Sequence, residues 1–270
     1  MSETTYTAVV LAASRRGAQD PVAQIQSLSH KCLVTLNGVP MVQRVIEALR
    51  GARQIGRIFV SIEDPGILRQ VPALAAMLDK GEIVAVRSEG NLAHSVYKAV
   101  AEIDAPFPLV VTTADNALHT PELVDYFCAE VGKADADVFV AMTRAQLILD
   151  KYPGGQRAFH RLKDDAYSSC NLYCIKTPAG VKAAEAFATG GQFGKKPERI
   201  INAFGLLAFV LYKLRLVSLD GVMSQISRAL KVRVRKVLIP WAEGPIDVDN
   251  AKDYALVTRI LENREGKKAA

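Results

Sequence analysis

The sequence predicts a three-layer α/β/α sandwich with a mostly parallel, mixed central sheet, a Rossmann-like arrangement. Residues 6–13 form a continuous apolar, β-favouring run, which is typical of a strand covered on both faces. Strand-like and helix-like segments then alternate along the chain, which is the pattern of repeated βαβ units. In a sheet of this kind, ligands bind at the carboxyl ends of the strands.

The elements of the first half follow from the spacing of apolar residues. After Gly38-Val39-Pro40, apolar residues recur at helical spacing from Met41 to Leu49, and residues 57–62 form the next predicted strand before a Pro-Gly break. The alternation then continues with a strand at 82–86, a helix at 95–103, a strand at 109–113, a helix at 121–131 and a strand at 137–142.

The second half is less regular. Its predicted elements are a strand at 170–175, helices at 179–188 and 218–230, a strand at 232–239, a helix at 251–262 and a frayed tail at 263–270. The apolar stretch 203–212 is too short to cross a membrane and is expected to be a core helix, with a surface helix that touches lipid or a partner subunit as the alternative. No internal repeat or linker is visible, so we expect one domain over residues 1–270 with a helical sub-region at about 190–230.

The composition indicates a globular protein of the cytoplasm. No run reaches the roughly 20 apolar residues of a membrane span, and the first residues lack the basic and apolar regions of a secretory signal. The four cysteines lack structural-zinc spacing and are expected to be reduced packing residues, namely Cys32, Cys128, Cys170 and Cys174.

The net charge of +6 is concentrated in a few basic stretches near residues 195–199, 213–215 and 231–236. This pattern indicates a local anionic partner. Nucleic acid is not expected, since no binding motif and no interleaved aromatic residues accompany the basic stretches. A phosphorylated metabolite or an anionic membrane surface fits better, and the sequence leaves open peripheral membrane contact and a homodimer.

The first feature with chemical meaning is a turn of small residues after the first strand. Leu11-Ala12-Ala13-Ser14 lets the backbone approach a ligand, so that its amides can meet phosphate oxygens. Arg15, Arg16 and Lys31 add positive charge, and Lys31 lies two residues before the pattern Leu-x-x-Leu-x-Gly-x-Pro, which starts at Leu33. Together these residues predict a cradle for a nucleoside triphosphate. Taken alone, a small-residue turn with two arginines is more often a solvated loop.

The second feature is Asp115, where an apolar strand stops at a carboxylate. A parallel sheet would place Asp115 on the ligand-binding edge, where it can hold a hard cation such as Mg²⁺ or Mn²⁺. The alternative is that Asp115 caps the helix that follows, but Thr120 is better placed to do so.

The third feature is a late acidic pair, Asp247 and Asp249. Residues two apart share one face of a strand, so either carboxylate could be a second metal ligand. Two carboxylates about 4 Å apart repel by roughly 4 kcal/mol at an effective dielectric of about 20, and a divalent cation between them converts this cost into binding.

With these features the sequence resembles the nucleotidyltransferases of the glycosyltransferase-A-like fold. It is most similar to the molybdenum-cofactor guanylyltransferase-like group and to the cytidylyltransferases that activate sugar acids and methylerythritol phosphate. The resemblance rests on the segment from Leu11 to Met41, on Gly90-Asn91-Leu92-Ala93-His94-Ser95-Val96, on the strand-terminal Asp115, and on the segment from Asp249 to Tyr254.

The resemblance implies a role for each matching position. The small-residue turn and Arg16 would approach the triphosphate, Lys31 would contact phosphate, and Gly90 and Ser95 would face the base or ribose. Asp115 and Asp249 would hold the metal. The resemblance also places the second substrate, the acceptor, near donors for an anion, which are Arg157, Ser169, Asn171 and Lys195.

The implied reaction is the transfer of a nucleoside monophosphate from a triphosphate, with CTP or GTP expected, to a phosphorylated acceptor. Two alternatives remain open. A glycosyltransferase on the same fold would usually carry Asp-x-Asp after the central strand, where this chain has Asp115-Asn116. The other alternative is a nucleotide-binding protein whose catalytic chemistry has decayed.

Overall fold

A computed structural model describes residues 5–154, 159–187 and 206–269. The strands of its main sheet are β1 (Tyr6–Leu11), β4 (Ile55–Ile62), β5 (Val84–Arg87), β6 (Leu109–Thr113), β7 (Val138–Arg144), β8 (His160–Arg161), β9 (Ala166–Ile175) and β10 (Val234–Leu238). A short hairpin joins β2 (Thr35–Leu36) to β3 (Val39–Pro40).

The helices flank this sheet. The α-helices are α1 (Pro21–Gln24), α2 (Met41–Gly51), α3 (Pro65–Arg69), α4 (Pro72–Asp79), α5 (Leu92–Glu102), α6 (Pro121–Lys133), α7 (Ala145–Lys151), α9 (Leu206–Lys213), α10 (Leu219–Leu230) and α11 (Ala251–Ala269). The 3-10 helices are η1 (Gly17–Gln19), η2 (Lys31–Leu33) and η3 (Pro178–Phe187).

The strand order is β10-β7-β9-β6-β1-β4-β5, with β8 paired to β9. Neighbouring strands are parallel except around β9, which runs antiparallel to β6, β7 and β8. The predicted mixed α/β sheet is therefore confirmed. Since β1 and β6 are parallel and Leu11 is paired with Thr113, the segments that follow both strands start at the same edge of the sheet.

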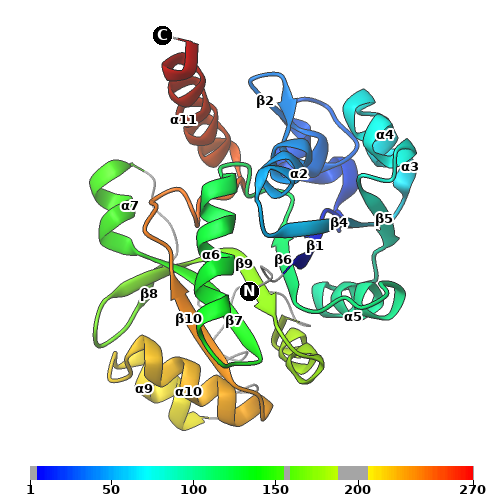
Figure 1. The fold of residues 1–270 in the computed structure, drawn as a ribbon. Helices are drawn as coiled ribbons and strands as arrows, with labels where there is room; N and C mark the ends of the chain where they lie inside the picture. The colour runs from blue at the N-terminus through cyan, green and yellow to red at the C-terminus, as the bar shows by residue number, and fades with distance from the viewer. Residues whose placement is uncertain (1–4, 155–158, 188–205, 270) are drawn as a thin grey trace.

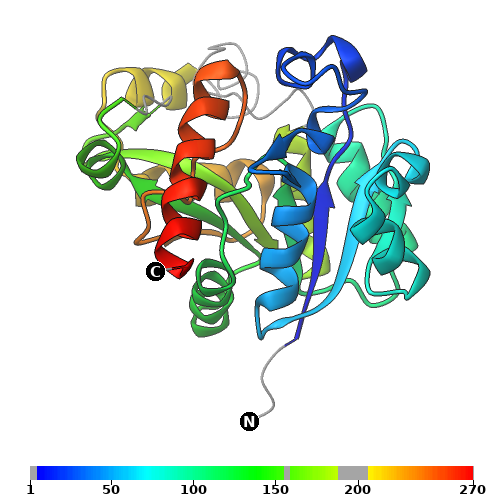
Figure 2. The same ribbon diagram turned by 90° about the horizontal axis from the view of Figure 1, so that it is seen from above.

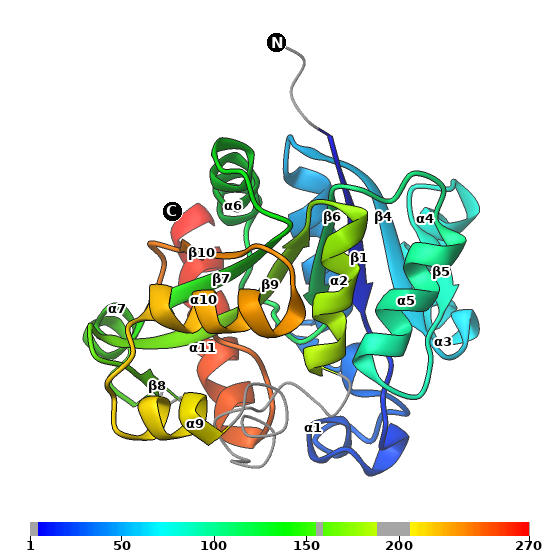
Figure 3. The same cartoon turned by 90° about the horizontal axis from the view of Figure 1, so that it is seen from below.

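Helices cover both faces of the sheet because its central strands are apolar on both sides. In β1, Tyr6 and Val10 belong to the core cluster under α2 and α6, whereas Val9 belongs to the cluster under α5. Figure 1 shows α2 and α6 on one side of the sheet and α5 on the other. Seen from below, α10, η3 and α5 lie across this second face (Figure 3).

Several helices begin where a polar side chain satisfies a backbone amide. The side chain of Asn91 accepts a hydrogen bond from the amide of His94 (2.9 Å) at the start of α5, and Thr120 accepts one from Leu123 (3.3 Å) at the start of α6. Thr120 therefore caps α6, which leaves Asp115 available for another role.

Three expectations differ from the structure. Residues 178–187 form the 3-10 helix η3 rather than an α-helix. The expected frayed tail is instead the end of α11, which packs against α1 and β2 (Figure 2). Of the apolar stretch 203–212, residues 203–205 lie outside the described residues and the rest lies in α9, where Leu211 and Tyr212 pack against a core cluster but Val210 is exposed, so the core-helix expectation is met only in part. No helix in the described ranges is long and apolar enough to span a membrane.

Candidate active site

One cleft of about 740 Å³ collects the three features singled out in the sequence. The turn after β1, the segment after β6 and the loop before α11 all contribute to its lining. The ammonium group of Lys31 lies 2.6 Å from Asp115 Oδ2 and 2.9 Å from Asp249 Oδ1. Residues that lie far apart in the sequence thus meet at one end of the cleft.

Lys31 is held in a charged state at this position. Burial lowers the pKa of the Lys31 amine, but the adjacent carboxylates of Asp115 and Asp249 outweigh burial and raise its pKa above the ordinary value. The ammonium group therefore stays protonated at physiological pH. Its side chain is 19% exposed, so the charge is still accessible from the cleft.

Asp247 joins Asp115 and Asp249, and their carboxylate oxygens lie within 4.8 Å of one another. Three carboxylates and the single ammonium of Lys31 leave a formal charge of about −2 at neutral pH. This oxygen-only set and its residual charge fit a divalent cation such as Mg²⁺. The loop that carries the late pair is tied to the strand end, since the Val248 amide donates to the Asp115 carbonyl (3.2 Å).

Two polar residues that the sequence analysis did not assign to the site support the carboxylates. The Thr113 hydroxyl lies 2.6 Å from Asp115 Oδ1 and 2.7 Å from Asn116 Oδ1, and it can donate to either. Asn116 is fully buried and accepts a hydrogen bond from Asn171 (3.2 Å). Both residues lie within two positions of Asp115, so the polar end of an apolar strand was the signal that could have indicated them.

Asn171 had been expected to contact the acceptor, and it lies beside the carboxylates. Its side-chain amide donates to Asp247 Oδ2 (3.0 Å) as well as to Asn116. Its φ of 47° is left-handed, at a point where the pairing of β7 with β9 shifts register between Val140 and Met142. The irregular strand thus directs an amide at the acidic cluster.

The small-residue turn lines the cleft with all of its predicted residues, which are Leu11, Ala12, Ala13, Ser14, Arg15 and Arg16. The turn is stabilised from within, because the Ser14 hydroxyl accepts from the Gly17 amide (3.0 Å) at a glycine with φ of 50°. The Ser14 amide donates to Glu63 (3.2 Å), a residue that the sequence analysis missed. A phosphate oxygen could accept a hydrogen bond from the Ser14 amide only if the Glu63 side chain moved away.

The structure does not bring Gly90 and Ser95 into the cleft. Ser95 is buried, and its hydroxyl accepts from the Glu89 amide (3.0 Å) and donates to the Glu89 carbonyl (3.3 Å). Among the described residues, the lining from this part of the chain comes from Leu92, Ala93 and Val96.

The structure describes only two of the four predicted acceptor residues. Ser169 and Asn171 line the cleft, and the Ser169 hydroxyl is 3.1 Å from that of Tyr173. Arg157 and Lys195 lie outside the described residues.

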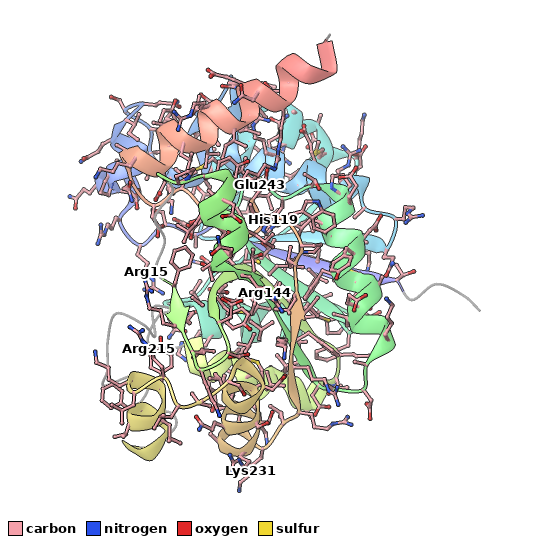
Figure 4. The ribbon with its side chains drawn as sticks, turned by 90° about the vertical axis from the view of Figure 1, so that its left-hand side faces the viewer. Arg15, His119, Arg144, Arg215, Lys231 and Glu243 are labelled. Carbon is pink, nitrogen blue, oxygen red and sulfur yellow. The ribbon has the colours of Figure 1, made fainter. Side chains whose placement is uncertain are left out.

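A buried histidine holds the loop that leads to the late acidic pair. His119 Nε2 lies 3.0 Å from the Gly244 carbonyl, as a donor when that nitrogen is protonated. Burial is the main cause that lowers the pKa of His119, to about 4. Figure 4 shows His119 beside Glu243, a buried carboxylate that pairs with Lys151 (2.7 Å).

The His119 pKa predicts a loss of stability in mild acid. The unfolded chain protonates this histidine near pH 6.5 and the folded chain only near pH 4, so folding loses stability as the pH falls through that window. The loss from this group should be about 2 kcal/mol between pH 7 and pH 5. Urea unfolding at both pH values should show a smaller loss for His119→Gln than for the wild type. The exposed His94→Gln variant should behave as wild type, and an equal loss in all three proteins would contradict the prediction.

Comparison with protein families gives one match over most of the chain. The family described as MobA-like NTP transferase domain matches residues 8–187. In a comparison with curated protein sequences, nothing matched this chain.

Solved structures with the same fold include several transferases. A hypothetical transferase from Thermus thermophilus is 24% identical, with a TM-score of 0.75 over 93% of this chain and 100% of that one. A CMP:2-keto-3-deoxy-manno-octonic acid synthetase complexed with CTP is 14% identical, with a TM-score of 0.55 over 97% and 100% of the two chains. A 4-diphosphocytidyl-2C-methyl-D-erythritol synthase from Anaerococcus prevotii is 13% identical, with a TM-score of 0.57 over 97% and 100%. At these identities the likeness establishes the fold.

Proposed function

Since the chain belongs to the MobA-like NTP transferase family, we propose that it transfers a nucleoside monophosphate from a nucleoside triphosphate to a phosphorylated small molecule and releases pyrophosphate. The observation that carries the proposal is the meeting of Lys31, Asp115 and Asp249 at the end of the cleft that the basic turn also lines. A triphosphate bound along this cleft would contact both parts.

In the proposed reaction, an oxygen of the acceptor phosphate forms a bond to the α-phosphorus. The bond from that phosphorus to the bridging oxygen of the β-phosphate breaks, and pyrophosphate leaves with the bonding electron pair. An acceptor phosphate is largely ionised at neutral pH, since its second pKa is about 6, so no general base is required. Catalysis then depends on positioning and on the neutralisation of charge.

The basic and the acidic residues of the cleft would have different roles in this reaction. Arg15 and Arg16 are exposed on the turn, where they would attract and orient the triphosphate. The Lys31 ammonium has three donors, and besides its two carboxylate partners it can donate to a phosphate oxygen. Asp115, Asp247 and Asp249 would hold Mg²⁺ or Mn²⁺, which when bound would neutralise charge on the phosphate oxygens.

The proposed donor is CTP or GTP. One neighbour of the same fold was solved with CTP, which supports the cytidine nucleotide. The resemblance of the sequence to the molybdenum-cofactor guanylyltransferase-like group supports GTP.

A pyrophosphate-release assay tests this function. The protein with Mg²⁺ would be incubated with each of the four nucleoside triphosphates and with sugar, polyol and alkyl phosphates. We expect release that requires both an acceptor and one preferred triphosphate. Triphosphate binding without release on any acceptor would favour a decayed binding protein. Sugar transfer from a nucleotide sugar, without pyrophosphate release, would favour a glycosyltransferase.

A further inference from the structure

Beyond the carboxylates, the cleft continues as an apolar arm between the sheet and the helices α9 and α10. We define the arm as the described lining of the cleft from residues 138–142, 160–169, 173–184 and 212–234, and its walls include Val140, Met142, His160, Tyr173, Met223 and Ile226. None of these carries a formal charge at neutral pH if His160 is neutral, whereas the described charged lining lies at the triphosphate end.

The arm is built by the sequence pattern of the second half. Val138, Val140 and Met142 alternate along β7 and therefore point to one face of the sheet, the face that α10 covers. On α10, Met223 and Ile226 are three residues apart and so lie on the same side of the helix. The sheet and the helix thus present facing apolar surfaces with space between them.

Four of the five polar side chains in the described lining of the arm pair with each other, and the fifth is Gln225 on α10. His160 Nδ1 lies 2.9 Å from the Tyr212 hydroxyl, and the Ser169 and Tyr173 hydroxyls lie 3.1 Å apart. Burial lowers the pKa of His160, so its imidazole is neutral at physiological pH. An acceptor rich in hydroxyl groups would have to break these pairs or bury its own hydroxyls against apolar atoms, and both are costly.

We propose that the acceptor is an amphiphilic phosphate ester, whose phosphate lies at the carboxylate end of the cleft and whose hydrocarbon chain fills the apolar arm. The inference rests on the proposed function and adds the class of acceptor. The total volume of about 740 Å³ is in the range of small-molecule sites, and an apolar wall with few polar groups selects an apolar chain.

The segment that carries Tyr212 gives a second observation. It also holds three of the large apolar side chains most exposed in the described structure, Val210, Leu214 and Leu216, interspersed with Lys213 and Arg215. Apolar side chains among basic ones suit the surface of an anionic membrane. In the view of Figure 4, Arg215 and Arg15 project from the same side of the molecule. An acceptor phosphate borne by a membrane could therefore reach the cleft.

Binding and turnover of an alkyl phosphate series test the arm. Methyl, butyl and octyl phosphate would be titrated by calorimetry into the protein with Mg²⁺, and kcat/KM for pyrophosphate release would be measured on the same compounds. We expect affinity to rise about four-fold for each added methylene that the arm buries. Affinity that does not change from methyl to octyl would overturn the proposal.

A variant with a charge in the arm tests the proposal further, and a variant with the same charge outside the cleft is its control. Ile226→Glu on α10 should weaken octyl phosphate much more than methyl phosphate, and Ile226→Gln should do so to a smaller degree if the charged variant fails to fold. Leu147→Glu places the same charge on α7 at a side chain that is 40% exposed and outside the cleft lining, and it should keep the chain-length dependence. Equal losses for methyl and octyl phosphate in the Ile226 variants would contradict the arm.

The same measurements separate this inference from the proposed function. Chain-dependent binding without pyrophosphate release from any acceptor would support the arm and refute nucleotidyl transfer. Release with a sugar phosphate and a flat alkyl series would support transfer and overturn the arm. Hexadecyl phosphate in phosphatidylcholine vesicles, compared with dispersed octyl phosphate, distinguishes a membrane-borne acceptor from a free one, and Leu216→Glu should lower turnover only on vesicles.

Discussion

Asp115→Asn is expected to lower pyrophosphate release by about 10²–10³-fold, the usual cost of removing a group that stabilises charge in the transition state. The change keeps the shape of the side chain but removes the charge that pairs with Lys31 and that would hold the divalent cation. Because Asp115 is partly exposed and Thr120 caps α6, the fold should survive. Turnover would be measured at saturating triphosphate over a range of Mg²⁺ concentrations.

Asp79→Asn is the matched control. Asp79 pairs with Arg69 (2.8 Å) on the surface, outside the described lining of the cleft, so its amide should leave turnover unchanged. Full activity of folded Asp115→Asn at ordinary Mg²⁺ would remove this carboxylate from the mechanism.

Lys31→Met is expected to weaken triphosphate binding by about ten- to a hundred-fold, since a hydrogen bond to a charged group contributes about 1.5–3 kcal/mol. The same change removes the ammonium that pairs with Asp115 and Asp249, so Mg²⁺ affinity in the absence of nucleotide should not fall. The opposite responses of the two ligands distinguish the loss of a phosphate contact from general damage to the site. Calorimetric titration with each ligand measures both.

Lys98→Met is the control that tests whether the loss of any lysine would weaken triphosphate binding. Lys98 pairs with Glu102 (3.0 Å) on the surface of α5, and triphosphate affinity should be unchanged in this variant. Lys31→Arg keeps the charge in a planar group and should recover part of the affinity. Triphosphate affinity that is unchanged in Lys31→Met would exclude this lysine from the phosphate site.

The order of strands and helices could be predicted because each core strand and helix of this fold has its own local pattern of apolar residues. Residues 109–113 form β6 as predicted, since an apolar run buried on both faces has few alternatives. Shorter elements escaped prediction. The four-residue helix α1 is capped by Asp20, whose carboxylate accepts from the Val22 amide (2.9 Å), and too few apolar residues follow to show a helical period.

Where the structure differs from the sequence-based expectations, contacts between residues far apart in the sequence explain the difference. A Cβ on Gly180 would lie 2.6 Å from the Asp137 carbonyl, so close approach to the sheet accompanies the 3-10 form of η3. The end of α11 stays helical where Arg264 donates to the Leu118 carbonyl (3.0 Å) and Glu265 pairs with Arg44 (2.9 Å). Neither kind of contact can be inferred from the neighbours of a residue in the sequence.

In the candidate site, too, some positions could be predicted from the local sequence and others could not. Asp115 was predictable because the end of a buried strand fixes where a following carboxylate lies. Asn171 was predicted to contact the acceptor, and its place beside the acidic cluster could not be predicted, because a left-handed residue and a register shift set the direction of its side chain. Glu63 follows an ordinary strand, and nothing local indicates that it accepts the Ser14 amide.

The contact of Lys31 with both Asp115 and Asp249 has a consequence for biosynthesis. The two ion pairs join residues 84 and 218 positions apart. A ribosome makes the amino-terminal strands first, so the growing chain can start its sheet long before the late acidic pair exists. Competence to bind a metal-nucleotide complex should therefore arise only after the segment with Asp247 and Asp249 has been translated, and fragments released before that point should be inert.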